Sequence, residues 1–351
     1  MKEERAVKMR WLAGVAVVSL ALGGAARALD TVKTTKTPLP GHIVSVTAVT
    51  VELEQGMNKP PREIPVNQIQ TILYDREPPD LRAAKNHVLA GRYAEALAAI
   101  ERIKTEGNRP EIEQDIEFYR ALCAAKLALA GGGKISEAGR LMKAFADANS
   151  KSYHYFEASE IVGDLLVAVH RYAMAAEYYD RLDKAPWPDY KMRAGVAAGR
   201  ALLAQGKADE AQAAFDKVIA IDAEGELAQG QRTLARLGKA RALLAAKKTE
   251  AAIKLATEVL KATDAEDVPL LAQGYNVLGT AYRQAGRTEE ALLAFLHVDV
   301  LYASLPDAHA EALANLAELW EQAHKTERAN HARKVLEEQY PDSPWAKKAG
   351  G

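Results

Sequence analysis

The chain has 351 residues, and its 46 basic and 47 acidic side chains give a formal net charge of −1. Removing residues 1–28, which carry five basic and two acidic side chains, changes that charge to about −4. A mildly acidic chain is a poor match for nucleic acid as the main partner, because phosphate binding needs a concentrated basic surface. The only cysteine is Cys123, so the chain forms no internal disulfide.

The first 28 residues have the pattern of a secretory signal. Four basic residues precede an apolar run from Trp11 to Ala26, and Ala26-Arg27-Ala28 fits an A-x-A cleavage site. We therefore expect cleavage between Ala28 and Leu29. The apolar run is shorter than the roughly 20 residues of a spanning helix; an uncleaved anchor, which would hold the protein near a membrane, is the alternative. An exported, disulfide-free chain fits the bacterial periplasm or cell envelope.

Residues 29–78 divide into two parts. Residues 29–41 are polar and rich in threonine, and we interpret them as a flexible lead-in. Residues 42–78 show β-type alternation, and a change of phase between Ala48 and Val49 indicates a bulge or a tight turn. Two short strands are expected at 62–66 and 69–74. The interpretation is a small β module that resembles an SH3-like or Sm-like barrel and leans on the first helices for its core.

Pro78 and Pro79 mark the next boundary, because both restrict the backbone and the second removes a hydrogen-bond donor. Residues 79–345 are rich in alanine and leucine with few prolines, which predicts an almost wholly helical segment. Its breaks fall at glycines 131–133, at Pro186-Trp187-Pro188 and near Pro306. Residues 346–351 remain as a tail.

One helical hairpin pattern recurs within residues 79–345. Its clearest copy reads Tyr275-x2-Leu278-Gly279-x2-Tyr282, followed by Gly286, Ala291 and Phe295. The small residues let helix backbones approach closely, and the large ones fill the space between them. The pattern resembles the tetratricopeptide repeat, with Tyr275 where that family usually has tryptophan. The resemblance implies a stack of helical hairpins.

Six weaker copies keep the same register. The alanines that anchor the second helices are spaced by 36 to 42 residues, against about 34 in the family pattern, so we expect extended helices or inserted loops. Gly163 and Gly199 take the place of Gly279, whereas Lys247 stands where a turn glycine is usual. The expected fold is an all-α superhelix of about seven helix-turn-helix repeats. The anchoring alanines are Ala96, Ala138, Ala175, Ala211, Ala252, Ala291 and Ala329.

Catalytic motifs are missing from the sequence. It contains no G-x-S-x-G, no phosphate-binding glycine loop and no paired-cysteine motif. His324 and His331 could share a helix face, but no carboxylate–histidine pattern accompanies them, and we interpret them as solvated. Cys123 is interpreted as a buried thiol. We expect no enzyme, no cofactor and no metal site.

The resemblance also implies that the first helices of the repeats line a concave groove holding an extended or helical peptide. The groove is expected to alternate from acidic to basic to acidic, and its basic stretch to clamp an acidic segment, since guanidinium groups bind carboxylates bidentately. The alternative is ordinary solvated charges. Carried over from Gly279, the partner-binding residues are Arg193, Arg200, Arg241, Gln273, Asn276, Thr280, Arg283 and Gln284; the acidic ones are Glu157, Glu160 and Asp164, then Glu311, Glu318 and Glu321.

The expected function is non-enzymatic protein–protein binding, as a scaffold or adaptor of the bacterial cell envelope. The segment from Tyr340 to Trp345 is similar to endings in periplasmic tetratricopeptide proteins of envelope assembly. Three alternatives stand beside this function: an accessory factor for outer-membrane or peptidoglycan assembly, a structural oligomer, and an unrecognised enzyme. The sequence leaves the partner and the oligomeric state open.

Overall fold

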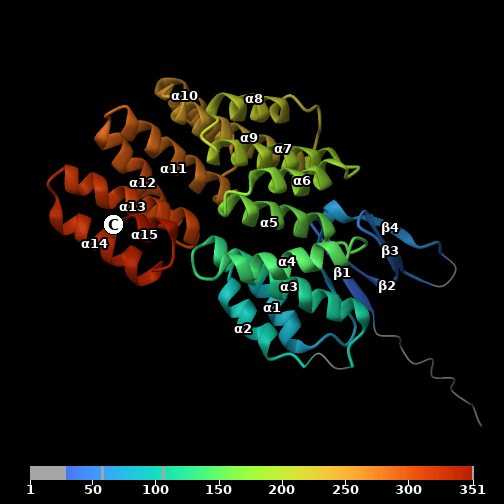
Figure 1. Ribbon diagram of the computed structural model, residues 1–351. Helices are drawn as coiled ribbons and strands as arrows, with labels where there is room; N and C mark the ends of the chain where they lie inside the picture. Colours follow the sequence, from blue (N-terminus) through green and yellow to red (C-terminus); the bar gives the residue numbers. More distant parts are fainter. Residues whose placement is uncertain (1–28, 57–58, 105–106, 350–351) are drawn as a thin grey trace, which may run out of the picture.

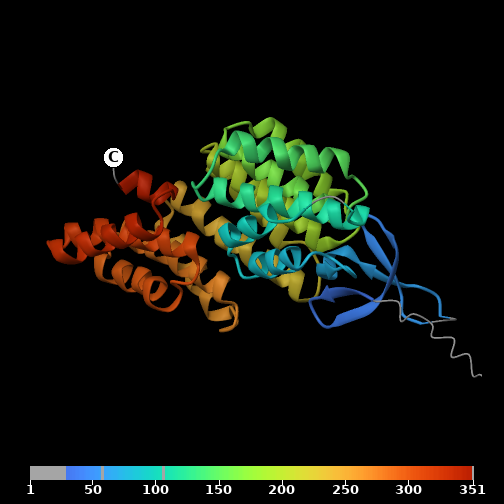
Figure 2. The same ribbon diagram turned by 90° about the horizontal axis from the view of Figure 1, so that it is seen from below.

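In the part of the chain that the structure describes, a small antiparallel sheet precedes fifteen α-helices that wind into a superhelix (Figures 1 and 2). The computed structural model describes residues 29–56, 59–104 and 107–349. The signal-peptide and membrane-anchor interpretations concern residues 1–28 and so lie outside the described residues. Within the described ranges, no helix is both long enough and apolar enough to cross a membrane.

The helices form seven antiparallel hairpins, which we name repeats 1 to 7, and one closing helix. The expected number of repeats is confirmed, and the long spacings arise partly from α3 and α9, with 20 residues each. The repeats are α1 (Pro79–Leu89) with α2 (Tyr93–Glu101), α3 (Pro110–Leu129) with α4 (Ile135–Ala148), α5 (Tyr155–Ala168) with α6 (Tyr172–Asp183), α7 (Pro188–Ala204) with α8 (Ala208–Ile219), α9 (Glu226–Ala245) with α10 (Thr249–Ala262), α11 (Val268–Gln284) with α12 (Thr288–Leu301), and α13 (Pro306–Gln322) with α14 (Thr326–Gln339).

The closing helix α15 (Pro344–Ala349) covers the end of the last repeat. Trp345 packs against the apolar cluster formed by α11 to α14. This packing covers apolar surface of the last two repeats described. The expected tail at 346–351 is therefore wrong as far as Ala349, which still belongs to this helix.

Small residues on the first helices make room for aromatic rings on the second helices. A Cβ atom on Gly163 would lie 2.2 Å from the ring of Tyr179, and one on Gly279 would lie 2.8 Å from Phe295. The ring of Phe215 meets two such glycines, Gly199 of its own repeat and Gly238 of the next, and a Cβ atom on either would lie 2.5 Å from it. The packing role expected for these aromatic residues is confirmed.

The first helices end in a common left-handed turn. In repeat 5 the amide of Lys248 donates to the carbonyl of Leu243, and that of Lys247 donates to Leu244, which is a Schellman motif. The residue at this turn is glycine in repeats 1, 2, 4 and 6, but His170, Lys247 and His324 also adopt a positive φ in repeats 3, 5 and 7. The turn therefore forms without glycine, although a left-handed residue with a Cβ atom costs about 1–2 kcal/mol.

We expect Lys247→Gly to stabilise the protein by about 1 kcal/mol, because glycine relieves the strain of the left-handed conformation. The φ angle of Lys247 is 59°, and urea unfolding measures the gain. The control is Lys248→Gly at φ −91°, where no strain is relieved and no gain is expected. Equal gains at both positions would mean that removal of a charge, rather than relief of strain, is responsible.

The sheet comprises β1 (Asp30–Thr34), β2 (Pro38–Val46), β3 (Thr50–Glu54), β4 (Arg62–Pro65) and β5 (Ile69–Leu73). Its strand order is β4-β3-β2-β1-β5, all antiparallel, and a short 3-10 turn separates β4 from β5. The small β module is confirmed. The flexible lead-in expected at 29–41 is wrong, because β1 and the start of β2 pair there. The change of phase near Ala48 is a tight turn, in which the amide of Thr47 donates to the carbonyl of Thr50 at 2.9 Å.

The sheet packs along repeats 1 to 4 and braces them. It shares one apolar core with the first helices (Figure 1). Thr71 of β5 shares a 3.0 Å hydrogen bond with Tyr119 of α3. Asn67, just before β5, donates to Asp189 at the start of α7 at 3.0 Å. The expectation that the module leans on the first helices therefore extends as far as the fourth repeat.

An ion cluster is buried where the sheet meets the helices. The ammonium of Lys85 on α1 lies 2.7 Å from Glu77 and 2.8 Å from Asp115 of α3, and it donates to the carbonyl of Ile72 at 2.6 Å. Burial alone would raise the pKa of Asp115, but the charge of Lys85 and the hydrogen bond with His154 hold that pKa below its ordinary value. These side chains have almost no exposed surface, so the cluster fixes the sheet to the helices.

Candidate partner-binding groove

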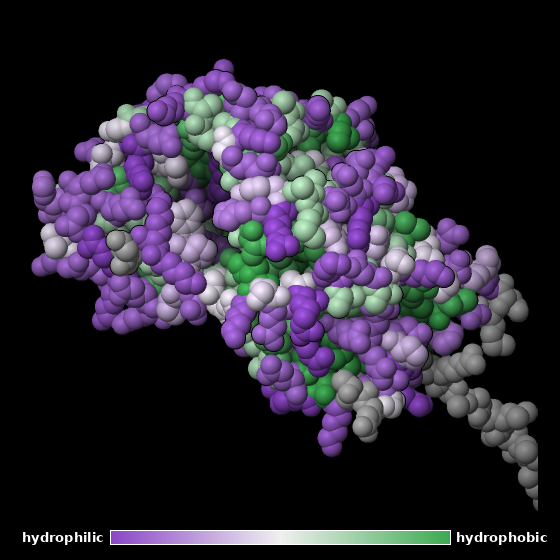
Figure 3. Space-filling model, in the orientation of Figure 1, coloured by the Kyte–Doolittle hydropathy of each residue, from purple (hydrophilic) through white to green (hydrophobic). Residues whose placement is uncertain are grey.

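The inner face of the superhelix is formed by the odd-numbered helices, which pack side by side along it. Arg241 on α9 reaches Glu311 on α13, past the intervening α11, with an N–O distance of 3.4 Å. A contact that skips one helix requires a face that curves inward. Figure 3 shows a hollow between the C-terminal repeats and the rest of the molecule, bordered by hydrophilic side chains. We call the inward faces of α5, α7, α9, α11 and α13 the groove.

Charges of opposite sign are paired across neighbouring helices in the first part of the groove. Arg193 on α7 forms an ion pair with Glu160 on α5, and Arg200 lies 3.2 Å from Asp164. Burial alone would lower the pKa of Arg193, but the charge of Glu160 raises it above its ordinary value. The acidic side chains of α5 and the basic side chains of α7 are therefore paired with each other rather than free.

The second part of the groove is paired in the same way. Arg283 on α11 donates to Glu318 of α13 at 2.6 Å and to Asn315 at 2.8 Å. Together with the contact between Arg241 and Glu311, this gives each groove arginine a carboxylate on another helix. These charges therefore pair with carboxylates of other helices, which join α5 to α7, α11 to α13 and α9 to α13.

The polar residues of α11 have different surroundings. The side chain of Asn276 has no exposed surface, and its amide donates to the carbonyl of Ala308 on α13 at 2.9 Å. The prediction that it contacts a partner is therefore wrong, because it fixes α11 to α13. Thr280 donates to the carbonyl of Asn276 on its own helix. Gln273 is half-buried and Gln284 is exposed, so both keep surface for a partner.

Two groove arginines also keep much of their surface. The side chain of Arg200 is 50% exposed and that of Arg241 is 45% exposed. Both use Nη2 in their hydrogen bonds to carboxylates. A guanidinium group carries five N–H donors, so each of these arginines has donors left for a second acceptor.

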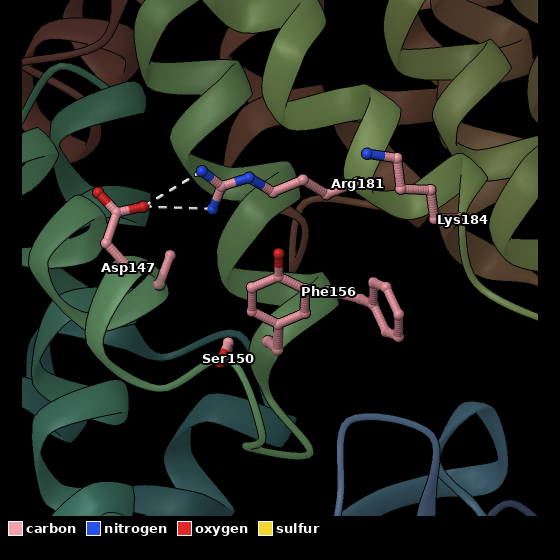
Figure 4. Close-up of a pocket in the computed structure, with 7 residues that line it drawn as sticks. Asp147, Ser150, Phe156, Arg181 and Lys184 are labelled. Carbon is pink, nitrogen blue, oxygen red and sulfur yellow. Dashed lines mark hydrogen bonds and ion pairs between the residues drawn. The ribbon is translucent and has the colours of Figure 1, made fainter.

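A pocket of about 410 Å³ lies outside the groove, between α4, α5 and α6 (Figure 4). Across it, Arg181 donates through both terminal nitrogens to Asp147 at 3.2 Å. Burial alone would raise the pKa of Asp147, but Lys143 and Arg181 hold it below its ordinary value, which opposes use as a general acid. The lining residues are Ala146, Asp147, Ser150, Tyr155, Phe156, Arg181 and Lys184.

Metal-binding geometry is absent from residues 29–56, 59–104 and 107–349, where no three His, Cys, Asp or Glu side chains are grouped to hold an ion. His324 lies in a turn at φ 55° and His331 lies within α14, so the two do not share a helix face. Cys123 is buried as expected, and burial raises the pKa of its thiol to about 12.

The superhelix is similar to solved structures of repeat proteins. A tetratricopeptide repeat protein from Parabacteroides merdae matches 78% of this chain and 98% of its own, with a TM-score of 0.50 and 15% identity. The fold is a tetratricopeptide-repeat superhelix. A Rap protein complexed with Competence and Sporulation Factor matches 77% of each chain, with a TM-score of 0.52 and 12% identity. Identities this low concern the fold alone. No protein-family model and no curated protein matches the chain.

The resemblance drawn from the tetratricopeptide pattern is confirmed, but sequence reasoning missed the pairing of charges. A signal for it existed, because Asp164 and Arg200 are 36 residues apart, and Arg283 and Glu318 are 35 apart. Opposite charges about one repeat apart, on first helices, meet between neighbouring helices of the groove. The buried cluster had a weaker signal, which was the single ammonium of Lys85 beside apolar positions of α1.

Proposed function

We propose that the protein binds a segment of a partner protein, extended or helical, in the groove and acts as a non-enzymatic scaffold or adaptor. The observation that carries this proposal is the preformed inward-curving face built from packed helices and inter-helix ion pairs. A preformed surface loses little ordering entropy on binding. A Rap protein of this fold was solved complexed with Competence and Sporulation Factor, which supports a partner-holding role for such a superhelix.

The partner segment carries carboxylates that bind Arg200 and Arg241. The half-exposed guanidinium groups of these residues support this, because their remaining donors can bind a second carboxylate beside the intramolecular one. Gln273 and Gln284 offer further hydrogen-bonding groups on α11. An acidic segment must compete with Asp164 and Glu311, so its affinity depends on ionic strength.

The site of action is the bacterial periplasm or cell envelope. The signal-like pattern of residues 1–28 supports this, and the expected cut after Ala28 lies two residues before Asp30, the first residue of β1. The buried carboxylate of Asp30 is held by Arg109 at 2.9 Å, so a chain that begins at Leu29 keeps this anchor. Intact mass of the exported protein tests the cut, because a retained signal adds 28 residues.

An affinity capture from cell-envelope extract tests the proposal. The bait is residues 29–351, beside an Arg200→Glu/Arg241→Glu variant. We expect a partner that the unaltered protein captures and the variant loses at least tenfold. The control is Lys254→Glu/Lys261→Glu, which makes the same change of charge on the exposed outer side of α10 and should capture normally. Circular dichroism confirms that both variants are folded.

Each other outcome favours a different function or surface. Equal capture by all three proteins keeps the adaptor and moves the binding surface away from the two arginines. Outer-membrane or peptidoglycan-assembly proteins among the captured partners would favour the accessory-factor role. If no partner is captured and the apparent mass of the protein rises with its own concentration, a structural oligomer would be favoured. The exposed apolar side chains of Leu293, Val300 and Leu301 on α12 offer a surface for that.

A further inference from the structure

The end of the chain touches the second repeat. Lys347 on α15 donates to the carbonyl of Gly131, which lies in the turn between α3 and α4, at 3.1 Å. These residues are 216 positions apart, and Figures 1 and 2 both show this turn beside α15. The superhelix therefore closes on itself, and repeat 7 meets repeat 2 across one side of the groove.

The approach at this point is unusually close. Gly131 has a φ of 95°, and a Cβ atom added to it would lie 1.4 Å from the carbonyl oxygen of Asp342. A Cβ atom on the neighbouring Gly132 would lie no closer than 3.6 Å to any atom outside its own backbone surroundings, which is ordinary contact. Only Gly131 of the triplet is therefore required by the contact with the end of the chain.

Repeat 7 directs the end of the chain toward this contact. His309 at the start of α13 bridges Asp299 of α12 and the hydroxyl of Tyr340, at 2.8 Å to each. Ser343 then caps α15 by accepting from the amide of Ala346 at 3.0 Å. Segment 340–347 is thus held firmly by its own repeat.

The contact between the end of the chain and repeat 2 is much smaller than the contacts that brace the first four repeats. Its hydrogen bond is exposed to solvent, whereas the sheet joins repeats 1 to 3 through a shared core and reaches repeat 4 through the hydrogen bond between Asn67 and Asp189. Repeats 5 to 7 lie beyond the strands of that brace. The closed superhelix therefore has two parts, repeats 1 to 4 with the sheet and repeats 5 to 7. The contact between Lys347 and Gly131 that closes it is small and exposed to solvent.

We infer that segment 340–347 is a releasable clasp, which holds the superhelix closed and limits access to the groove until repeats 5 to 7 swing away from the turn at Gly131. The existence of the clasp is independent of the proposed function. Its role in admitting a partner segment rests on that function.

Distances between two spin labels test the clasp without any partner. The protein used comprises residues 29–351, and the spin labels are attached to it through Glu137→Cys and Glu338→Cys. These are exposed positions of α4 and α14, on the two sides of the contact. Cys123 is buried and its thiol pKa is raised to about 12, so it stays unlabelled. The releasing variant is Gly131→Ala. The control is Gly206→Ala, at φ 75° with nothing within 4 Å of an added Cβ, which has similar backbone strain but no contact to lose.

We expect one narrow, short distance in the parent protein and in Gly206→Ala, and a longer, broader distribution in Gly131→Ala. Lys347→Ala should add a minor long-distance population. The clasp is overturned if Gly131→Ala leaves the distribution unchanged, or if the parent is already broad. A label pair at Lys254→Cys and Glu289→Cys, exposed positions of α10 and α12, must stay unchanged, which distinguishes opening from unfolding.

The captured partner then tests the second half of the inference. If Gly131→Ala opens the closed superhelix and captures the partner several-fold better than the parent protein, the clasp limits access to the groove. If Gly131→Ala opens the superhelix but captures the partner no better, the clasp exists but its role in limiting access is refuted. Failure of capture by the parent and by Gly131→Ala would count against the proposed function, while the label distances would still decide whether the clasp exists.

Discussion

Lys85→Ala is expected to lower the free energy of unfolding by about 3–5 kcal/mol, because it leaves buried carboxylates without their cation. The ammonium of Lys85 lies within 2.8 Å of both Glu77 and Asp115, and all three side chains are buried. Urea unfolding of residues 29–351, followed by circular dichroism, measures the loss. Lys85→Met should lose a similar amount, since it keeps most of the side-chain volume but not the charge.

The matched control is Arg102→Ala. Its ion pair with Asp80 has the same 2.7 Å length as the pair between Lys85 and Glu77, but both of its side chains are substantially exposed. Exposed pairs contribute about 0–1 kcal/mol. A loss at Lys85 no greater than at Arg102, or a neutral Lys85→Met, would mean that burial of the pair has no energetic consequence.

Phe215→Ala is expected to cost about 3–5 kcal/mol, the range for truncating a buried phenylalanine. The ring has no exposed surface and fills the space above Gly199 and Gly238 on two successive first helices. Its removal leaves a cavity between repeats 4 and 5. Leu293→Ala, on a second helix but 61% exposed, should change stability by less than about 0.5 kcal/mol.

A double-mutant cycle with Gly238→Ala sharpens this test. An added Cβ at Gly238 would lie 2.5 Å from the Phe215 ring, so the alanine should destabilise the parent protein. In the Phe215→Ala background the ring is gone and the same alanine should be harmless or mildly stabilising. Additive effects would contradict the account of glycine as space for the ring.

The repeat architecture could be predicted because its signal is periodic. Gly163, Gly199 and Gly279 mark the same packing position, and the alanines of the second helices keep the register even where Lys247 replaces a turn glycine. The start of the sheet could not be predicted in the same way. β1 is a short threonine-containing strand whose place depends on pairing with β5, 35 or more residues later, and local sequence gives no measure of that pairing.

The groove shows a similar limit. Positions on the first helices could be assigned from Gly279, and Arg200 and Arg241 do lie on the inner face. Which side chains are free there depends on how far one helix lies from the next. Asn276 fits the groove pattern on its own helix, yet α13 approaches closely enough to bury it and accept its hydrogen through Ala308.

The sheet that lies along the first four repeats changes how loss of structure spreads through the chain. In a simple array each repeat touches only its neighbours, so opening events stay local and independent. The hydrogen bond between Asn67 and Asp189 spans 122 residues, and together with the core that the sheet shares with the first helices it leads us to expect repeats 1 to 4 to unfold as one cooperative unit. For repeats 5 to 7 we expect the graded, repeat-by-repeat opening of an array. We therefore expect protease cleavage and amide hydrogen exchange to occur first in repeats 5 to 7. In repeats 1 to 4 both should occur only when the whole unit unfolds.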